Sequence, residues 1–264
     1  MRRRFIAGNW KMFNVQGETR DFFNKFNVLL NDNADVIKAI IDKSIEIALF
    51  PPMLSIASAV ESSGDVAISI GAQNCHFEKS GAFTGEVSAP MLADAGCTHV
   101  IIGHSERRHI FGEHDAMLNK KTISALEEGL IPVFCVGELL EEREEGKTFE
   151  VVERQTVRGL ESIDAATVAE KIIIAYEPVW AIGTGKTASK EDAQEVCAFI
   201  RKLLTDKYGS GVADRVLILY GGSVKPDNTK AIMSQPDVDG VLVGGASLKP
   251  DSFYAIVKEA LSEI

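Results

Sequence analysis

Two side chains that can move protons follow short apolar runs of this sequence. Glu177 comes directly after Ile172–Tyr176, and partial burial at such a position raises the pKa of a carboxyl group towards that of a general base near neutral pH. His104 follows another apolar run, and Ser105 and Glu106 after it can begin a helix. A helix N-terminus disfavours an imidazolium, so His104 can stay neutral and donate an N–H to a developing oxyanion. The structural alternatives are a salt-bridged glutamate at a strand end and a histidine without a catalytic part.

Side chains and turns that suit an anion follow three other apolar runs. Asn9 and Lys11 come after the first run and can supply an amide donor and a positive charge, although a solvated surface lysine explains Lys11 equally well. Paired glycines begin the segments Gly221–Val224 and Gly244–Ser247. Glycine turns that open short helices expose backbone N–H groups, and such groups bind phosphate. Either segment alone could be only a tight turn, but the two together indicate a phosphate site.

The segment after Glu177 is rich in glycine and threonine. Pro178 stiffens its start, while Gly183 and Gly185 permit unusual backbone dihedrals, so we expect a lid that excludes water. The segment matches nucleotide-binding motifs only in part. A P-loop requires a glycine where this chain has Trp180, and a relaxed dinucleotide fingerprint at this place is weak evidence alone.

Eight short runs rich in valine and isoleucine, each followed by a helical pattern, must position these residues. Continuous apolar runs are typical of strands buried on both faces of a parallel sheet. The predicted strands are Phe5–Asn9, Ile45–Phe50, Val66–Ala72, His99–Gly103, Ile131–Val136, Ile172–Tyr176, Val216–Tyr220 and Gly240–Val243. Eight βα units fit a closed barrel or a doubly wound open sheet, and the length of 264 residues favours the barrel. We predict an α/β fold, one (β/α)8 barrel over residues 1–264, with the active face at the strand ends.

Several helix boundaries can be read between the strands. Ser189 precedes acidic residues as an N-cap does, and Pro226 and Pro250 stand where a proline begins a helix at no cost in hydrogen bonds. Gly129 suits the C-cap of the helix that precedes the run at 131–136.

Composition argues against several classes of protein. The formal net charge of −10 argues against a nucleic-acid binder. The four cysteines form no CxxC pair and lack zinc-ligand spacing, so we expect reduced thiols and no metal. No apolar run approaches the roughly 20 residues that span a membrane, and the stretch after Arg2–Arg4 is too short for a signal peptide. We therefore expect a cytoplasmic protein with no nucleic-acid or membrane partner, and a solvated start at the three arginines.

The motifs taken together resemble those of the triosephosphate isomerase family. The matching segments keep the family's order along essentially the whole chain: Gly8–Met12, Ile102–Arg107, Tyr176–Ala188, Tyr220–Val224 and Asp239–Leu248. Several unrelated motifs at consistent strand positions are more specific than any one of them. The resemblance implies a TIM barrel that interconverts dihydroxyacetone phosphate and D-glyceraldehyde 3-phosphate through an enediolate, in glycolysis and gluconeogenesis, without a metal or organic cofactor.

The resemblance also implies a role for each site residue. Glu177 would transfer the proton, His104 would polarise the carbonyl group, and Lys11 would add positive charge as a third catalytic residue. Asn9 would help to orient the substrate, which Lys11 would also bind. The backbone N–H groups that would hold the phosphate belong to Gly183, Ser223, Gly244 and Gly245.

Further contacts follow from the same resemblance. Glu106 would support Lys11, and Cys135 would pack beside the catalytic base. The chain would form a homodimer through the Gln73–Glu86 loop, which would bring Thr84 close to the partner's site.

Three other interpretations were weighed against this one. Another phosphate-binding barrel isomerase or lyase would share the glycine turns, but it would not need both His104 and Glu177. A nucleotide-binding protein would need a complete P-loop or an acidic ribose partner about 20 residues beyond the glycines. A non-catalytic barrel would tolerate the loss of a catalytic residue, yet all the candidates are present in this chain.

Overall fold

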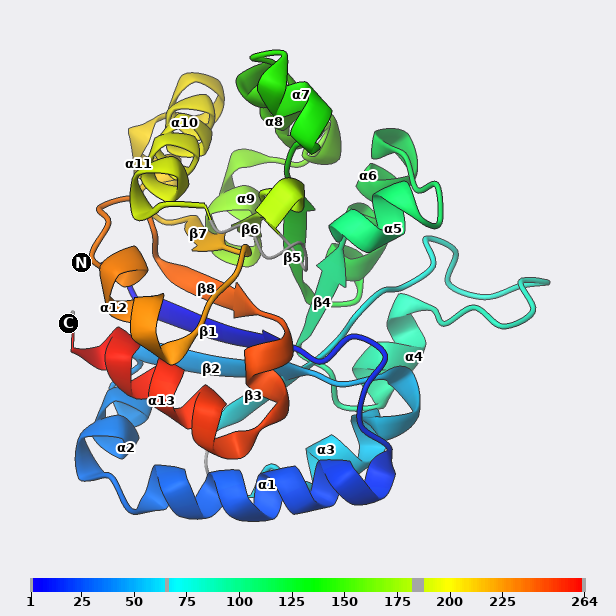
Figure 1. Cartoon of the computed structure of the whole chain (residues 1–264). Coiled ribbons are helices and arrows are strands. Elements are labelled where there is room, and N and C mark those ends of the chain that lie inside the picture. The colour runs from blue at the N-terminus through cyan, green and yellow to red at the C-terminus, as the bar shows by residue number, and fades with distance from the viewer. Residues whose placement is uncertain (1, 65–66, 182–187, 263–264) are drawn as a thin grey trace.

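The computed structural model describes residues 2–64, 67–181 and 188–262, in which eight parallel strands close into a barrel surrounded by helices (Figure 1). Each strand pairs with its neighbours in sequence order, and β1 closes the barrel against β8. The strands are β1 (Arg4–Asn9), β2 (Ile45–Phe50), β3 (Ile68–Ala72), β4 (His99–Ile102), β5 (Ile131–Val136), β6 (Ile173–Tyr176), β7 (Leu217–Tyr220) and β8 (Gly240–Val243). The predicted single-domain (β/α)8 barrel is therefore confirmed.

Helices follow the strands around the outside of the barrel. The α-helices are α1 (Gln16–Asn31), α2 (Ala34–Ile41), α3 (Ile56–Ser62), α4 (Ala89–Asp94), α5 (Ser105–His109), α6 (Asp115–Glu127), α7 (Leu140–Glu144), α8 (Thr148–Gly159), α9 (Ala165–Lys171), α10 (Lys190–Tyr208), α11 (Ser210–Ala213), α12 (Pro226–Met233) and α13 (Pro250–Leu261). Short 3₁₀ turns are η1 (Met53–Ser55), η2 (Val179–Ala181) and η3 (Gly245–Leu248).

The predicted strands and helix boundaries agree with these elements to within one or two residues. β4 ends at Ile102 because Gly103 turns the chain with a φ of 75°. The predicted start of the third strand at Val66 lies outside the described residues. Ser189 caps α10 by accepting a hydrogen bond from the Asp192 N–H at 3.0 Å.

Apolar side chains form two buried clusters. One fills the inside of the barrel, and the other lies between the strands and the surrounding helices. The strands are almost completely buried, which accounts for their continuous apolar sequences. The interior cluster consists of Phe5, Ala7, Ala48, Phe50, Ile101, Val133, Cys135, Ile173, Ala175, Leu217, Leu219 and Leu242. This rigid core holds the ends of the strands in fixed relative positions.

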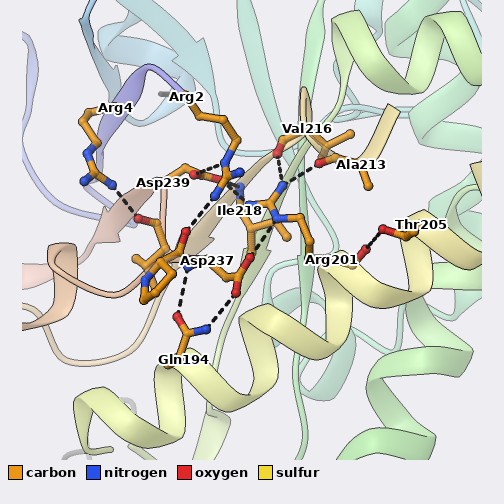
Figure 2. Close-up of polar contacts among 12 residues, drawn as sticks. Arg2, Arg4, Gln194, Arg201, Thr205, Ala213, Val216, Ile218, Asp237 and Asp239 are labelled. Carbon is orange, nitrogen blue, oxygen red and sulfur yellow. Dashed lines mark hydrogen bonds and ion pairs between the residues drawn. The ribbon is translucent and has the colours of Figure 1, made fainter. Parts of the chain in front are cut away.

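An ion-pair network clamps the segment that enters β8 (Figure 2). Arg201 of α10 donates to Asp239 Oδ2 at 2.6 Å and to Asp237 Oδ1 at 3.1 Å. Arg2 donates to the other oxygen of Asp239 at 2.5 Å, and Arg4 donates to the Val238 carbonyl at 2.8 Å. The expectation of a merely solvated N-terminus is therefore wrong for these two arginines, because barrel closure brings β1 beside the start of β8.

The loop between β3 and α4 projects from the body of the barrel at the right of Figure 1. We call the segment Gln73–Glu86 the arm. Its base is held where the His76 N–H donates to the Val87 carbonyl at 2.7 Å, and Lys79 pairs with Glu128 at 2.8 Å. Within the described part of the chain, no helix is both long enough and apolar enough to cross a membrane.

Candidate active site

Glu177 and His104 face each other at the carboxyl ends of β6 and β4. The distance from Glu177 Oε1 to His104 Nε2 is 2.9 Å, and Glu177 Oε2 accepts a hydrogen bond from the Ser105 backbone N–H at 2.9 Å. His104 Nδ1 accepts the Glu106 N–H at 3.2 Å, which places the imidazole proton on Nε2. Glu177 is 2% exposed and His104 is 5% exposed. The two predicted acid–base residues therefore form one buried pair.

Burial and neighbouring donors act in opposite directions on the pKa of Glu177. Burial raises this pKa, whereas the charge and hydrogen bond of His104, the Ser105 N–H and the charge of Lys11 lower it. The resulting pKa lies below the ordinary glutamate value. The expectation of a raised pKa is thus wrong for this arrangement, because the donors outweigh desolvation.

The protonation of His104 depends on both ring nitrogens. Burial lowers its pKa, while the charge and hydrogen bond of Glu177 raise it above the ordinary histidine value. An imidazolium would carry a second proton on Nδ1, directly facing the Glu106 N–H that this nitrogen accepts. The hydrogen bond at Nδ1 opposes this rise, because it is made by a ring whose single proton lies on Nε2, where it donates to Glu177.

Lys11 has a left-handed backbone conformation, with a φ of 51°. Its N–H donates to Asn9 Oδ1 at 3.0 Å, and Gln73 Nε2 donates to its carbonyl at 2.7 Å. Its Nζ lies 2.7 Å from Glu106 Oε1, which is the support that the resemblance implies. A non-glycine residue keeps such a conformation only where several contacts enforce it. These contacts hold the ammonium group at the rim of the barrel.

The predicted site residues meet at one cavity of about 380 Å³. Its lining includes Asn9, Lys11, His104, Glu177, Ser223, Gly244 and Gly245. A Cβ built on Gly244 would lie 3.7 Å from Lys11 Cε, so the lysine stem runs beside the turn after β8. Gly183, the remaining predicted ligand of the phosphate, lies outside the described residues together with the rest of 182–187. The cavity therefore combines an acid–base pair, an ammonium group and two glycine turns.

Sequence reasoning missed the residues that hold Glu177 in place. The Ser105 N–H binds its carboxylate. A Cβ on Gly137 would lie 1.7 Å from the Glu177 carbonyl oxygen, and one on Gly221 would lie 2.9 Å from its Cγ. Gly137 and Gly221 directly follow predicted strands, so the sequence placed them at strand ends. It did not predict that they contact Glu177. Gln73, which supports Lys11, was predicted only as the first residue of the subunit-contact loop.

Cys135, the predicted neighbour of the catalytic base, lies beside Glu177. Burial raises its pKa well above the ordinary thiol value, and the charge of Glu177 raises it further. All four cysteines are free and buried. Among the described residues, no cluster of His, Cys, Asp and Glu side chains has the arrangement to hold a metal ion.

The fold and the site define a class: a single-domain (β/α)8-barrel enzyme with a carboxylate and an imidazole at the strand ends. The model of the triosephosphate isomerase family matches residues 4–260. A triosephosphate isomerase of Carboxydothermus hydrogenoformans is 53% identical over 99% of this chain and all of its own length. Those of Dictyoglomus thermophilum and Syntrophotalea carbinolica are 52% and 50% identical, each over 98% of this chain, and over 100% and 98% of their own lengths. The chain therefore belongs to the triosephosphate isomerase family, and it is an isomerase.

Proposed function

We propose that Glu177 is the base with which this isomerase interconverts dihydroxyacetone phosphate and D-glyceraldehyde 3-phosphate, a step of glycolysis and gluconeogenesis. The carboxylate takes a proton from the hydroxyl-bearing carbon beside the carbonyl group, which leaves an enediolate. A proton passes from the hydroxyl oxygen to the former carbonyl oxygen, and the protonated Glu177 returns its proton to the former carbonyl carbon. The lowered pKa of Glu177 keeps the free enzyme's carboxylate ionised at neutral pH. A base must be ionised before it can accept the substrate proton.

His104 is the electrophile in this proposal. Its Nε2–H points at Glu177 in the substrate-free enzyme and donates to the carbonyl oxygen once the substrate lies between the two side chains. Proton transfer to Glu177 removes the negative charge that raises the His104 pKa, while burial continues to lower it. Both effects favour a neutral imidazole at the moment when it must donate a hydrogen bond to the oxyanion.

Lys11 and the two glycine turns bind the substrate in this proposal. The ammonium group attracts the dianionic phosphate and the developing enediolate, and Asn9 supports the turn on which Lys11 stands. Backbone N–H groups of Ser223, Gly244 and Gly245 hold the phosphate at the rim of the cavity. Gly183 remains a predicted fourth ligand. No residue in this scheme needs a metal or an organic cofactor.

The observation that carries the proposal is the 2.9 Å contact between Glu177 Oε1 and His104 Nε2 inside a cavity that also contains Lys11. The test is proton NMR of D-glyceraldehyde 3-phosphate in D₂O with the purified enzyme and no added metal. We expect fast formation of dihydroxyacetone phosphate with deuterium incorporated at carbon. The variant Glu177→Gln keeps the shape of the side chain and should abolish both signals, whereas Glu141→Gln on α7 should change neither.

Two results would contradict the proposal in different ways. Turnover that survives in Glu177→Gln would show that another group is the base. No turnover by folded wild-type enzyme would instead contradict the substrate assignment.

We also propose a homodimer through the arm. A second cavity of about 360 Å³ adjoins the site and is lined by Lys11, Met12 and Phe111. Met12 is 93% exposed and Phe111 is 63% exposed, while Phe83 on the arm is 43% exposed. Apolar side chains gathered around a concave surface favour a protein partner. The arm of a second copy, with Thr84 near the neighbouring site, fits this surface.

Residues 1–264 act as one catalytic domain in this proposal, and the enzyme works in the cytoplasm. The barrel shares one continuous shell of buried side chains from β1 to α13, which supports a single domain. Four free, buried thiols are typical of a reducing compartment.

A further inference from the structure

Arg108 of α5 is a buried cation that has no part in the proposed reaction. Its side chain is 7% exposed, and its guanidinium carbon lies 5.6 Å from the centre of the Phe134 ring. Its Nε donates to the Gly103 carbonyl at 2.9 Å, and its Nη2 donates to the Cys135 carbonyl at 2.9 Å. Its Nη1 pairs with Asp115 at 2.6 Å. Three of the donors of one planar group are thus committed to three separate acceptors.

One carbonyl group belongs to the turn that carries His104, and the other belongs to β5, which pairs with β6, the strand that precedes Glu177. Gly103 is the residue before His104 and turns the chain out of β4 with a φ of 75°. Cys135 precedes Val136, whose carbonyl accepts the Glu177 backbone N–H at 2.7 Å. The guanidinium therefore joins the backbone that carries the imidazole to the strand that holds the backbone of the carboxylate.

The Arg108 guanidinium group is closely packed against Gly103 and Cys135. A Cβ on Gly103 would lie 3.1 Å from Arg108 Nη2 and 3.2 Å from the Cys135 carbonyl oxygen. A guanidinium presents its donors in a rigid plane, whereas a lysine ammonium is a single point that cannot reach two carbonyl groups and a carboxylate in this geometry. Asp115 of α6 neutralises the buried charge.

We propose that Arg108 is a positioning residue, which sets the contact between His104 Nε2 and Glu177 Oε1 through the carbonyl groups of Gly103 and Cys135. The inference rests on the proposed roles of His104 and Glu177. Unlike the acid–base pair, the Lys11 ammonium group and the glycine turns, Arg108 reaches no substrate atom. It acts only on the distance between the two reacting groups.

The test is the variant Arg108→Lys, with Arg108→Gln as a second variant if the first does not fold. We expect kcat to fall roughly ten- to hundredfold with KM within about threefold, because a displacement of about 1 Å between reacting groups costs about this much rate. The Nε2–H resonance of ¹⁵N-labelled His104 should shift and exchange faster with water in the same samples. Arg154→Gln is the matched control, since Arg154 also pairs with Asp115, at 3.4 Å, but is 52% exposed; it should keep wild-type kcat.

A wild-type kcat and an unchanged His104 resonance in either folded variant would overturn the proposal. A loss of kcat that is fully explained by the unfolded fraction, measured by circular dichroism, would overturn it as well. The NMR comparison needs no turnover, so it still tests the positioning role if the wild-type enzyme shows no triose phosphate isomerisation and the proposed function fails.

Discussion

At the scale of single residues, the site depends on donors that are aimed at one carboxylate. Glu177 is buried, yet its pKa lies below the ordinary value because His104 and the Ser105 N–H bind its two oxygens. The same donors that keep the base ionised also occupy both of its oxygens. Substrate must therefore compete with the enzyme's own hydrogen bonds before the base can act.

The position of the Glu177 carboxylate can be tested by shortening the side chain. Glu177→Asp keeps the charge but retracts the carboxylate by one methylene group. We expect kcat to fall by about a hundredfold or more while KM changes little, because the loss occurs in the transition state. Steady-state kinetics in both directions measure the two constants. A wild-type kcat in Glu177→Asp is incompatible with the role of Glu177 as the base.

A second titratable residue should make stability depend on pH. His99 is 1% exposed and packs against Phe5 and Phe50 inside the barrel, with Glu46 at 3.4 Å. Burial and, to a smaller extent, the charge of Arg3 lower its pKa to about 4 against the opposing charge of Glu46. Above pH 6.5 the ring is neutral in both folded and unfolded chains. Below this pH His99 becomes protonated in the unfolded chain but stays neutral in the folded chain. The free energy of unfolding therefore falls with pH until about pH 4.

The size of this effect follows from the two pKa values. The difference between 6.5 and about 4 corresponds to roughly 3 kcal/mol of unfolding free energy lost on going from pH 7 to pH 4. Urea unfolding across this range measures the loss. In His99→Gln the loss should be smaller by roughly this amount. Parallel pH profiles for the two proteins would rule out His99 as the source.

At the scale of elements, α10 and β1 together fasten the entrance to β8. Asp239 is 2% exposed and accepts hydrogen bonds from Arg201, Arg2 and the Ile218 N–H. Arg201 also donates to the carbonyl groups of Ala213 and Val216, at 2.6 and 2.7 Å. The helix, the first strand and the last two strands therefore meet at one buried network (Figure 2).

Arg201 and Arg2, which both bind Asp239, should differ in their contribution to stability. Arg201→Met leaves Asp237 and Asp239 without their buried partner, so we expect a loss of about 3–5 kcal/mol. Arg2→Met should cost about 1 kcal/mol, because the Arg2 side chain is 25% exposed and Arg201 still neutralises Asp239. Urea unfolding of both variants at one protein concentration gives the comparison. Equal losses would show that the network is not centred on Arg201.

In the whole molecule, the arm contacts the barrel through Gln73 at its start and projects beyond it. It leaves the barrel after β3 and returns at α4 (Figure 1). Its Phe83 is 43% exposed and packs against His76. The proposed dimer gives this protruding segment a partner surface beside Lys11. In the proposed dimer, activity and association would be linked, because the partner's arm would complete the wall of the site.

A charge placed on the arm should separate the subunits. In Phe83→Asp we expect dissociation to monomers at micromolar concentration and a loss of activity of about tenfold or more, because a charge would be buried at the interface. Phe149→Asp is the matched control, since Phe149 on α8 is similarly exposed, at 38% against 43% for Phe83. Sedimentation velocity and activity at several dilutions measure both effects. A monomeric wild-type enzyme with full activity would contradict the proposed dimer.

Much of this molecule could be predicted because the relevant information is local. Apolar runs marked all eight strands, Ser189 and Pro226 marked helix starts, and the residues directly after strands marked the cavity. Position after a strand is enough to bring Lys11 and Glu177 together, since all carboxyl ends of a parallel barrel lie on one face.

Local patterns in the sequence therefore predict the order of elements, the face that carries the chemistry and the family. Which groups come into contact depends on the tertiary structure. The Ser105 N–H and the Glu177 carboxylate are 72 residues apart in the chain, and Arg2 and Asp239 are 237 apart. Their contacts depend on strand register and barrel closure, which local patterns do not encode. The direction of the Glu177 pKa and the bridge made by Arg108 follow from those contacts, because electrostatic effects act over distances in space and not along the chain.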